Sequence, residues 1–167
     1  MSTPYLSLLE ALRSSCNLPE FPDPLPSNQM DLELDHGPTI TIDFNEETEF
    51  VELFSEIGTY HPEEELEVLR EIVQANFLWA ATSGGTLSAR PDIQTVYLAY
   101  QTPVLSLEGT AFVHLVEQFV DVVKQWQIIL LKSSHVKTVE SQEEETLAGT
   151  SEKSALSSVQ PSNFIAA

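Results

Sequence analysis

The side chains best suited to metal binding or acid–base catalysis are scattered through this sequence rather than grouped. None of the four histidines stands at metal-site spacing from a cysteine or from a second histidine. We expect all four to be solvated or capping side chains, since His36 and His61 flank turns and His114 lies in a predicted helix beside Leu115. They are His36, His61, His114 and His135. The sequence therefore indicates neither a metal site nor histidine-based catalysis.

The other candidates for chemistry are equally isolated. Cys16 is the single cysteine, which excludes an intramolecular disulfide, and it carries no nucleophile signature. Carboxylates are abundant, as in Glu63-Glu64-Glu65, but a catalytic acid needs a special environment rather than a crowd. The Ser83-Gly84-Gly85-Thr86 segment lacks the lysine of a phosphate-binding loop, and no calcium-loop spacing is present. We therefore expect no enzyme and no cofactor.

The charge balance narrows the choice of partner. The chain has 26 acidic and 7 basic residues among 167, a net charge of −19. Such an excess works against nucleic acids and anionic membrane surfaces, and it favours solubility and partners with Lys or Arg. The longest apolar run, residues 127–131, is too short to cross a bilayer, and the first residues lack a secretory signal. We expect a cytoplasmic protein that does not insert into a membrane.

Apolar spacing and turn residues predict an alternation of helices and strands. We expect helices over 3–16, 61–77 and about 106–132, and strands around 32–34, 40–44, 50–54, 86–90 and 94–101. This order, α-β-β-β-α-β-β-α, lacks strict βαβ alternation. It indicates an α+β fold in which helices pack on an antiparallel twisted sheet.

Two segments differ in composition from this pattern. Residues 19–26 hold four prolines and predict an irregular or extended linker. Residues 133–167 are rich in Ser, Glu and Thr, so we expect a polar, disordered tail after a domain over 1–132. The end of that tail, residues 163–165, is either a short docking motif or a frayed terminus.

An ordered set of short segments stands out over about residues 4–132. The set consists of Leu8-Leu9-Glu10-Ala11-Leu12 with Asn17-Leu18-Pro19, Ile40-Thr41-Ile42-Asp43, Phe54-Ser55-Glu56-Ile57-Gly58, residues 69–76, Gly84-Gly85, and Phe119-Val120-Asp121 with Trp126. Taken in this order, the set resembles the class I type III secretion chaperones, the Tir chaperone family of the CesT and SycE kind. The linker and the tail depart from the family pattern.

The resemblance implies a homodimer that binds secreted effector proteins. The family dimerises largely through its second helix, which implies an interface of Leu66, Leu69, Val73, Phe77 and Trp79, although the same spacing fits a plain core. The family also binds the extended N-terminal region of an effector in apolar grooves. The implied effector-binding residues are Leu9, Leu12, Leu32, Leu34, Phe44 and Phe50.

The leading hypothesis is thus a bacterial cytoplasmic chaperone that keeps one or more effectors soluble and secretion-competent. Strand addition at a sheet edge, with side chains in apolar pockets, would hold the effector, and the complex could dock to the secretion apparatus. Two alternatives remain open. One is a regulatory adaptor that sequesters a transcription or secretion factor, and the other is a small enzyme of unrecognised type.

Overall fold

The computed structural model describes residues 3–21, 28–34 and 37–155, with side chains described as far as Lys132. The chain divides into two compact units, Met1–Leu131 and Lys132–Ala167. The elements of the first unit are α1 (Thr3–Cys16), β1 (Gln29–Glu33), β2 (Thr39–Asn45), β3 (Phe50–Thr59), α2 (Glu65–Asn76), β4 (Thr86–Arg90), β5 (Thr95–Pro103) and the start of α3 (Gly109–Ala155). The predicted α+β order is confirmed.

The last helix runs farther than predicted. α3 continues past Lys132 to Ala155, so the predicted helix end is wrong, and residues 133–155 are helical rather than part of an irregular tail. An apolar stripe marks only the part of a helix that packs against a neighbour, whereas the backbone can continue without one. The division into 1–132 and 133–167 stays a prediction, and the candidate motif at 163–165 and most of the linker lie outside the described residues.

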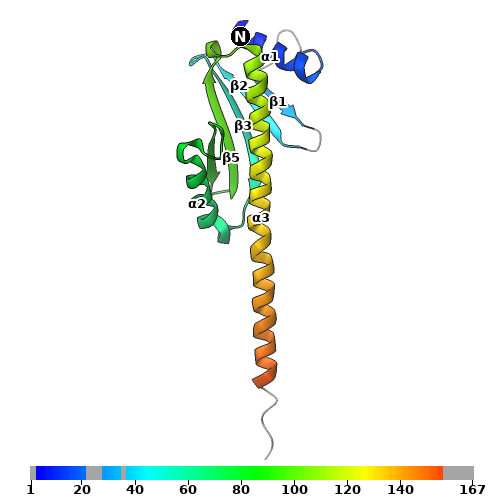
Figure 1. Ribbon diagram of the computed structural model, residues 1–167, viewed down its shortest axis with the longest axis vertical. Coiled ribbons are helices and arrows are strands. Elements are labelled where there is room, and N and C mark those ends of the chain that lie inside the picture. The colour runs from blue at the N-terminus through cyan, green and yellow to red at the C-terminus, as the bar shows by residue number, and fades with distance from the viewer. Residues whose placement is uncertain (1–2, 22–27, 35–36, 156–167) are drawn as a thin grey trace, which may run out of the picture. The chain divides into compact units, whose positions relative to one another are not determined.

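The strands form one antiparallel sheet in the order β1-β2-β3-β5-β4 (Figure 1). β3 is central and pairs with β5 along its length, from Phe50 opposite Pro103 to Thr59 opposite Thr95. β4 follows α2 in the chain and pairs only with β5, so it forms one edge of the sheet. β1 pairs only with β2 and forms the other edge.

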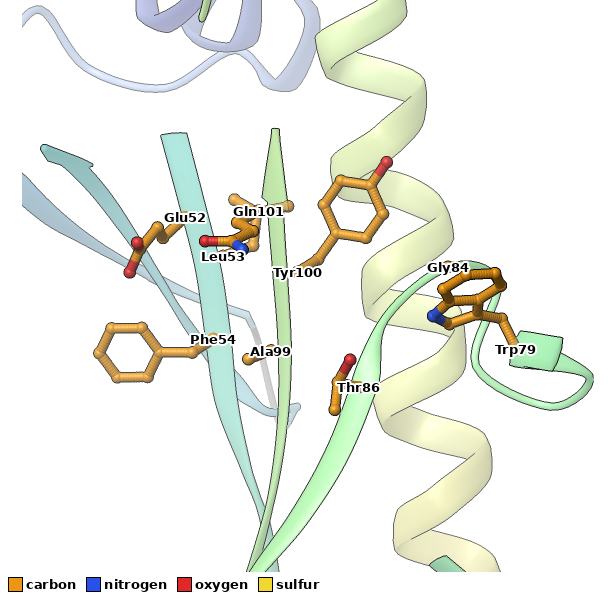
Figure 2. Close-up of a pocket in the computed structure, with 9 residues that line it drawn as sticks. All are labelled: Glu52, Leu53, Phe54, Trp79, Gly84, Thr86, Ala99, Tyr100 and Gln101. Atoms are coloured by element: carbon orange, nitrogen blue, oxygen red, sulfur yellow. The ribbon is translucent and has the colours of Figure 1, made fainter. Parts of the chain in front are cut away.

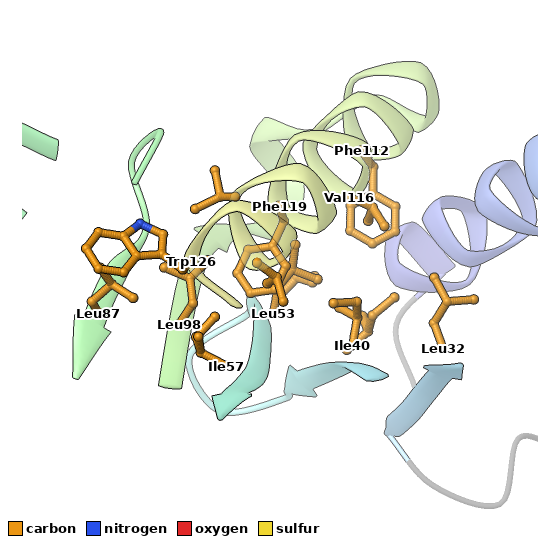
Figure 3. Close-up of a cluster of buried hydrophobic side chains, with 14 of the residues drawn as sticks. Leu32, Ile40, Leu53, Ile57, Leu87, Leu98, Phe112, Val116, Phe119 and Trp126 are labelled. Atoms are coloured by element: carbon orange, nitrogen blue, oxygen red, sulfur yellow. The ribbon is translucent and has the colours of Figure 1, made fainter. Parts of the chain in front are cut away.

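α1 and the first part of α3 cover one face of this sheet (Figure 3). Every second side chain of a strand points toward the helices, and the helices direct residues at helical spacing toward the sheet. The core includes Leu8, Leu9, Leu12, Ile40, Ile42, Leu53, Leu98, Phe112, Val116, Phe119 and Trp126. The opposite face of the sheet therefore carries the alternate strand residues.

Local side chains fix the turns that hold the sheet together. The Asn45 side chain accepts hydrogen bonds from the backbone N–H groups of Glu47 and Thr48 at 3.0 and 3.1 Å, which closes the β2–β3 turn. The β3–β5 register shifts between Glu56 and Gly58, and Gly58 has a φ of 153°. A bulge at this position suits glycine, since other residues rarely adopt that backbone.

Asn76, the last residue of α2, ties the helix to edge strand β4. Its amide nitrogen donates to the carbonyl of Leu87 at 2.8 Å, and its amide oxygen accepts from the Leu87 N–H at 2.9 Å. One side chain thus satisfies both backbone groups of a strand residue, as a neighbouring strand would. This part of the β4 edge is therefore occupied from within the chain.

Candidate protein-binding surfaces

Most of the residues implied as effector contacts lie inside the core. Leu9, Leu12, Leu32 and Phe44 are 1%, 0%, 8% and 3% exposed, respectively. The Phe44 ring stacks on Tyr5, with ring centroids 4.8 Å apart. Burial, with a smaller effect from nearby Asp43, raises the pKa of the Tyr5 phenol. These side chains stabilise the domain in this conformation, and their contact with an effector stays a prediction.

The other two implied contacts are partly accessible. Leu34, directly after β1, and Phe50, the first residue of β3, are both half-buried. Leu34 packs against the core cluster, and Phe50 lies opposite Asn45 and Pro103 on the neighbouring strands. All six implied contact residues thus lie in α1 or in and beside the sheet strands. Most of their apolar surface is already buried in the core of the domain.

The outer edge of β1 offers backbone groups instead of apolar surface. The Phe44 N–H donates to the carbonyl of Asn28 at 3.2 Å, so these two residues form a hydrogen-bonded pair in the β1–β2 register. Hydrogen-bonded pairs alternate along an antiparallel ladder. The N–H and C=O groups of Asp31 and Glu33 therefore point away from β2. No strand of the described residues pairs on that side.

A second surface follows the outer side of α2. Leu66, Val73, Phe77 and Trp79 are 62%, 72%, 70% and 57% exposed, and Leu69 is half-buried. A hollow of about 310 Å³ on this helix is lined by Leu66, Leu69, Arg70, Val73 and Gln74. The five residues implied as a dimer interface are thus largely uncovered, whereas a plain core would have buried them.

The turn after α2 adds an exposed residue that the sequence did not single out. Leu78 is 75% exposed, and Leu78 and Trp79 both have left-handed backbones, with φ of 53° and 54°. Such a backbone costs roughly 1–2 kcal/mol per residue. A hydrogen bond from α3 fixes this turn: the Trp126 indole N–H donates to the Ala81 carbonyl at 3.0 Å. No sequence pattern predicts these dihedral angles, so the exposure of Leu78 beside Trp79 is known only from the structure.

A third surface is a hollow of about 380 Å³ at the end of β4 (Figure 2). β4 pairs with β5 only as far as Ala99, so the following β5 residues extend past it. The lining residues are Glu52, Leu53, Phe54, Trp79, Gly84, Thr86, Ala99, Tyr100 and Gln101. Phe54 is 39% exposed although it lies mid-strand. This mixed aromatic and polar hollow was not predicted.

Ionisable groups on these surfaces show shifts with simple causes. Burial, with the charge of Glu67 second, raises the pKa of the Glu71 carboxyl on α2. The hydrogen bond from Arg90 holds the pKa of the Asp92 carboxyl below its usual range, and their closest atoms are 2.6 Å apart. Each shift thus has a local cause, which is burial beside Glu67 for Glu71 and the hydrogen bond with Arg90 for Asp92.

The described residues contain no group of three or more His, Cys, Asp or Glu side chains placed to hold a metal ion. Cys16 is exposed, and His114 contacts Glu117 at 3.1 Å. Across the same part of the chain, no helix is both long enough and apolar enough to cross a membrane.

Comparison with known proteins agrees with this geometry. A model of the Tir chaperone protein (CesT) family matches residues 7–127. No curated protein matches the chain significantly. Among solved structures, a chain of the ExsC-ExsE complex is similar at 17% identity and a TM-score of 0.59, covering 74% of this chain and 90% of that one.

Two further complexes contain the same fold. A chain of the heterodimeric ExoU-SpcU complex from the type III secretion system of Pseudomonas aeruginosa shares 16% identity at a TM-score of 0.57, covering 72% of this chain and 95% of that chain. A chain of the HopA1-SchA chaperone-effector complex shares 12% identity at a TM-score of 0.57, covering 76% and 92%. At such low identity these similarities establish the fold alone.

Proposed function

Because this chain belongs to the Tir chaperone protein (CesT) family, we propose that it is a cytoplasmic type III secretion chaperone. It binds the extended N-terminal region of one or more effector proteins and keeps them soluble and competent for secretion. The family match over residues 7–127 carries this proposal. The exposed apolar surfaces support it, since a monomeric protein without partners seldom leaves such side chains uncovered.

The outer edge of β1 is the proposed docking line for the effector backbone. Asp31 and Glu33 direct their backbone groups outward there, and half-buried Leu34 follows at the end of the strand. An extended segment that pairs with this edge gains main-chain hydrogen bonds, while its side chains supply specificity. Ordering such a segment costs about 2–5 kcal/mol, so apolar side chains of the effector must also be buried.

A homodimer through α2 is the second part of the proposal. The exposed stripe of Leu66, Leu69, Val73, Phe77 and Trp79 would be buried against the same stripe of a second copy, as a twofold interface requires. Val73→Glu should therefore yield monomers in light scattering without loss of helical signal. Gln118→Glu, an equal charge change at an exposed position on α3, should leave the dimer intact. Monomeric wild-type protein would contradict the dimer.

The effector proposal is tested by co-expression with secreted proteins encoded nearby, followed by size-exclusion chromatography and mass spectrometry. Asp31→Pro removes an outward N–H and no backbone bond to β2, so the complex should be lost while the free protein still folds. It also removes the 2.7 Å hydrogen bond from the Thr41 hydroxyl, so Asp31→Ala, which loses only that side-chain bond, should retain the complex. Asp31→Asn keeps the backbone donor and should retain the complex. The strand-addition mode is wrong if the proline variant binds an effector as tightly as the wild type. The chaperone function is wrong if no secreted protein co-purifies.

A further inference from the structure

The face of the sheet opposite α1 and α3 concentrates negative charge. The strand register places one set of carboxylates on this face, across β1, β2 and β3. They are Asp31, Glu33, Asp43, Glu52 and Glu56. Asp43 and Glu52 lie directly opposite each other on neighbouring strands, where like charges are destabilising. These opposed carboxylates do not stabilise the isolated domain.

Positive charge on the described strands does not compensate these carboxylates. Arg90 is the one Lys or Arg within β1 to β5, and it is already paired with Asp92. Asp31 accepts a hydrogen bond from the Thr41 hydroxyl at 2.7 Å, which does not reduce its charge. The face is thus electrically complementary to a cationic partner.

Aromatic side chains lie beside this charge. Phe54 follows Glu52 by two residues on β3, so both point to the same side of the sheet, and Trp79 flanks the hollow across Ala99 and Thr86 (Figure 2). Ala99 and Thr86 occupy the cross-strand positions beside Phe54 on β5 and β4, and their small side chains leave its ring accessible. An exposed aromatic face next to a carboxylate matches the chemistry of an ammonium or guanidinium group.

We propose that this sheet face binds a basic polypeptide segment, and that one of its arginine or lysine side chains enters the hollow beside Phe54. The carboxylates of β1 to β3 attract the segment, and Glu52 pairs with the inserted cation. This site goes beyond the proposed function, since Glu52 and Phe54 belong neither to the β1 edge nor to the α2 stripe. An acidic or purely apolar segment lacks the matching charge.

The test is calorimetric titration of the full chain with a blocked synthetic peptide, acetyl-Gly-Arg-Phe-Arg-Gly-amide. Binding should weaken at high salt, because screening reduces the attraction between the peptide and the carboxylates. Loss of a cation–π contact or of its paired charge should weaken binding about fivefold in Phe54→Ala and Glu52→Gln. Glu63→Gln, the same charge change away from the sheet, should bind as the wild type does.

Thr86→Leu provides a variant that keeps both Phe54 and Glu52 but fills the hollow, and it should also weaken binding. The proposal is overturned if the wild type does not bind the peptide, or if a peptide with glutamate in place of arginine binds equally well. It is also overturned if all three sheet variants bind like the wild type. A change of oligomeric state in Phe54→Ala would assign this face to a second copy of the chain instead. Effector co-purification tests the proposed chaperone function separately, so failure of peptide binding to the sheet face would not by itself refute that function.

Discussion

Replacing Asn76 by Ala should destabilise the domain by opening the β4 edge. The variant loses two hydrogen bonds, of 2.8 and 2.9 Å, that join its side chain to the N–H and C=O of Leu87. Each such bond contributes a net of about 0.5–1.5 kcal/mol, so we expect the free energy of unfolding to fall by about 1–3 kcal/mol. Water access to the vacated edge would place the loss near the lower end.

Urea denaturation measures this loss as a lower midpoint with an unchanged slope. Hydrogen exchange measures its location, because the Leu87 amide should lose protection before the rest of the sheet. Gln74→Ala is the control, since Gln74 lies on the same helix with an exposed side chain. Its free energy of unfolding should match that of the wild type.

Asn76→Asp separates the hydrogen bonds from the loss of side-chain volume. At neutral pH the carboxylate still accepts from the Leu87 N–H but faces the Leu87 carbonyl oxygen, so the variant should be at least as unstable as Asn76→Ala. Protonation in acid restores a donor, and the deficit relative to the wild type should shrink. The reasoning is refuted if Asn76→Ala changes the free energy by less than about 0.5 kcal/mol, below the range for two bonds, with Leu87 protection unchanged.

Three further outcomes follow from the structure. Phe44→Ala should lower the free energy of unfolding by about 3–5 kcal/mol because its ring is buried, and half-buried Phe50→Ala should cost less; equal losses in chemical denaturation would contradict this. Burial and Glu67 raise the pKa of Glu71, so its contribution to stability is present in acid and is lost as pH rises through the folded-state value. Glu71→Gln should therefore raise the melting temperature at neutral pH, with a gain in the free energy of unfolding of no more than about 1 kcal/mol. A larger gain in acid than at neutral pH would contradict the direction of this pKa shift. Removing the residues after Lys132 should leave the melting temperature unchanged, since the first compact unit ends at Leu131, and a lower value would show that the rest of α3 supports it.

The sequence by itself determines the elements and their order. Alternation in Ile40-Thr41-Ile42 and the helical spacing of Phe112, Val116 and Phe119 each follow from the geometry of one element, which needs only local residues. Strand β4 was predicted at its observed bounds, Thr86–Arg90, because a glycine pair and a Pro-Asp turn enclose it. Charge balance likewise restricted the partner without any coordinates.

Tertiary structure decides which apolar residues remain available to a partner. The stripe from Leu66 to Phe77 and the side chains of Leu9 and Phe44 look alike in the sequence, yet the first is exposed and the others are buried. The difference depends on which faces α1, α2 and α3 turn toward the sheet, and periodicity does not specify the neighbour of a face. The hollow beside Phe54 depends in the same way on the pairing of two strands. β4 begins at Thr86 opposite Ala99, so the rest of β5 has no neighbour from β4, and this is a property of the sheet register rather than of any single segment.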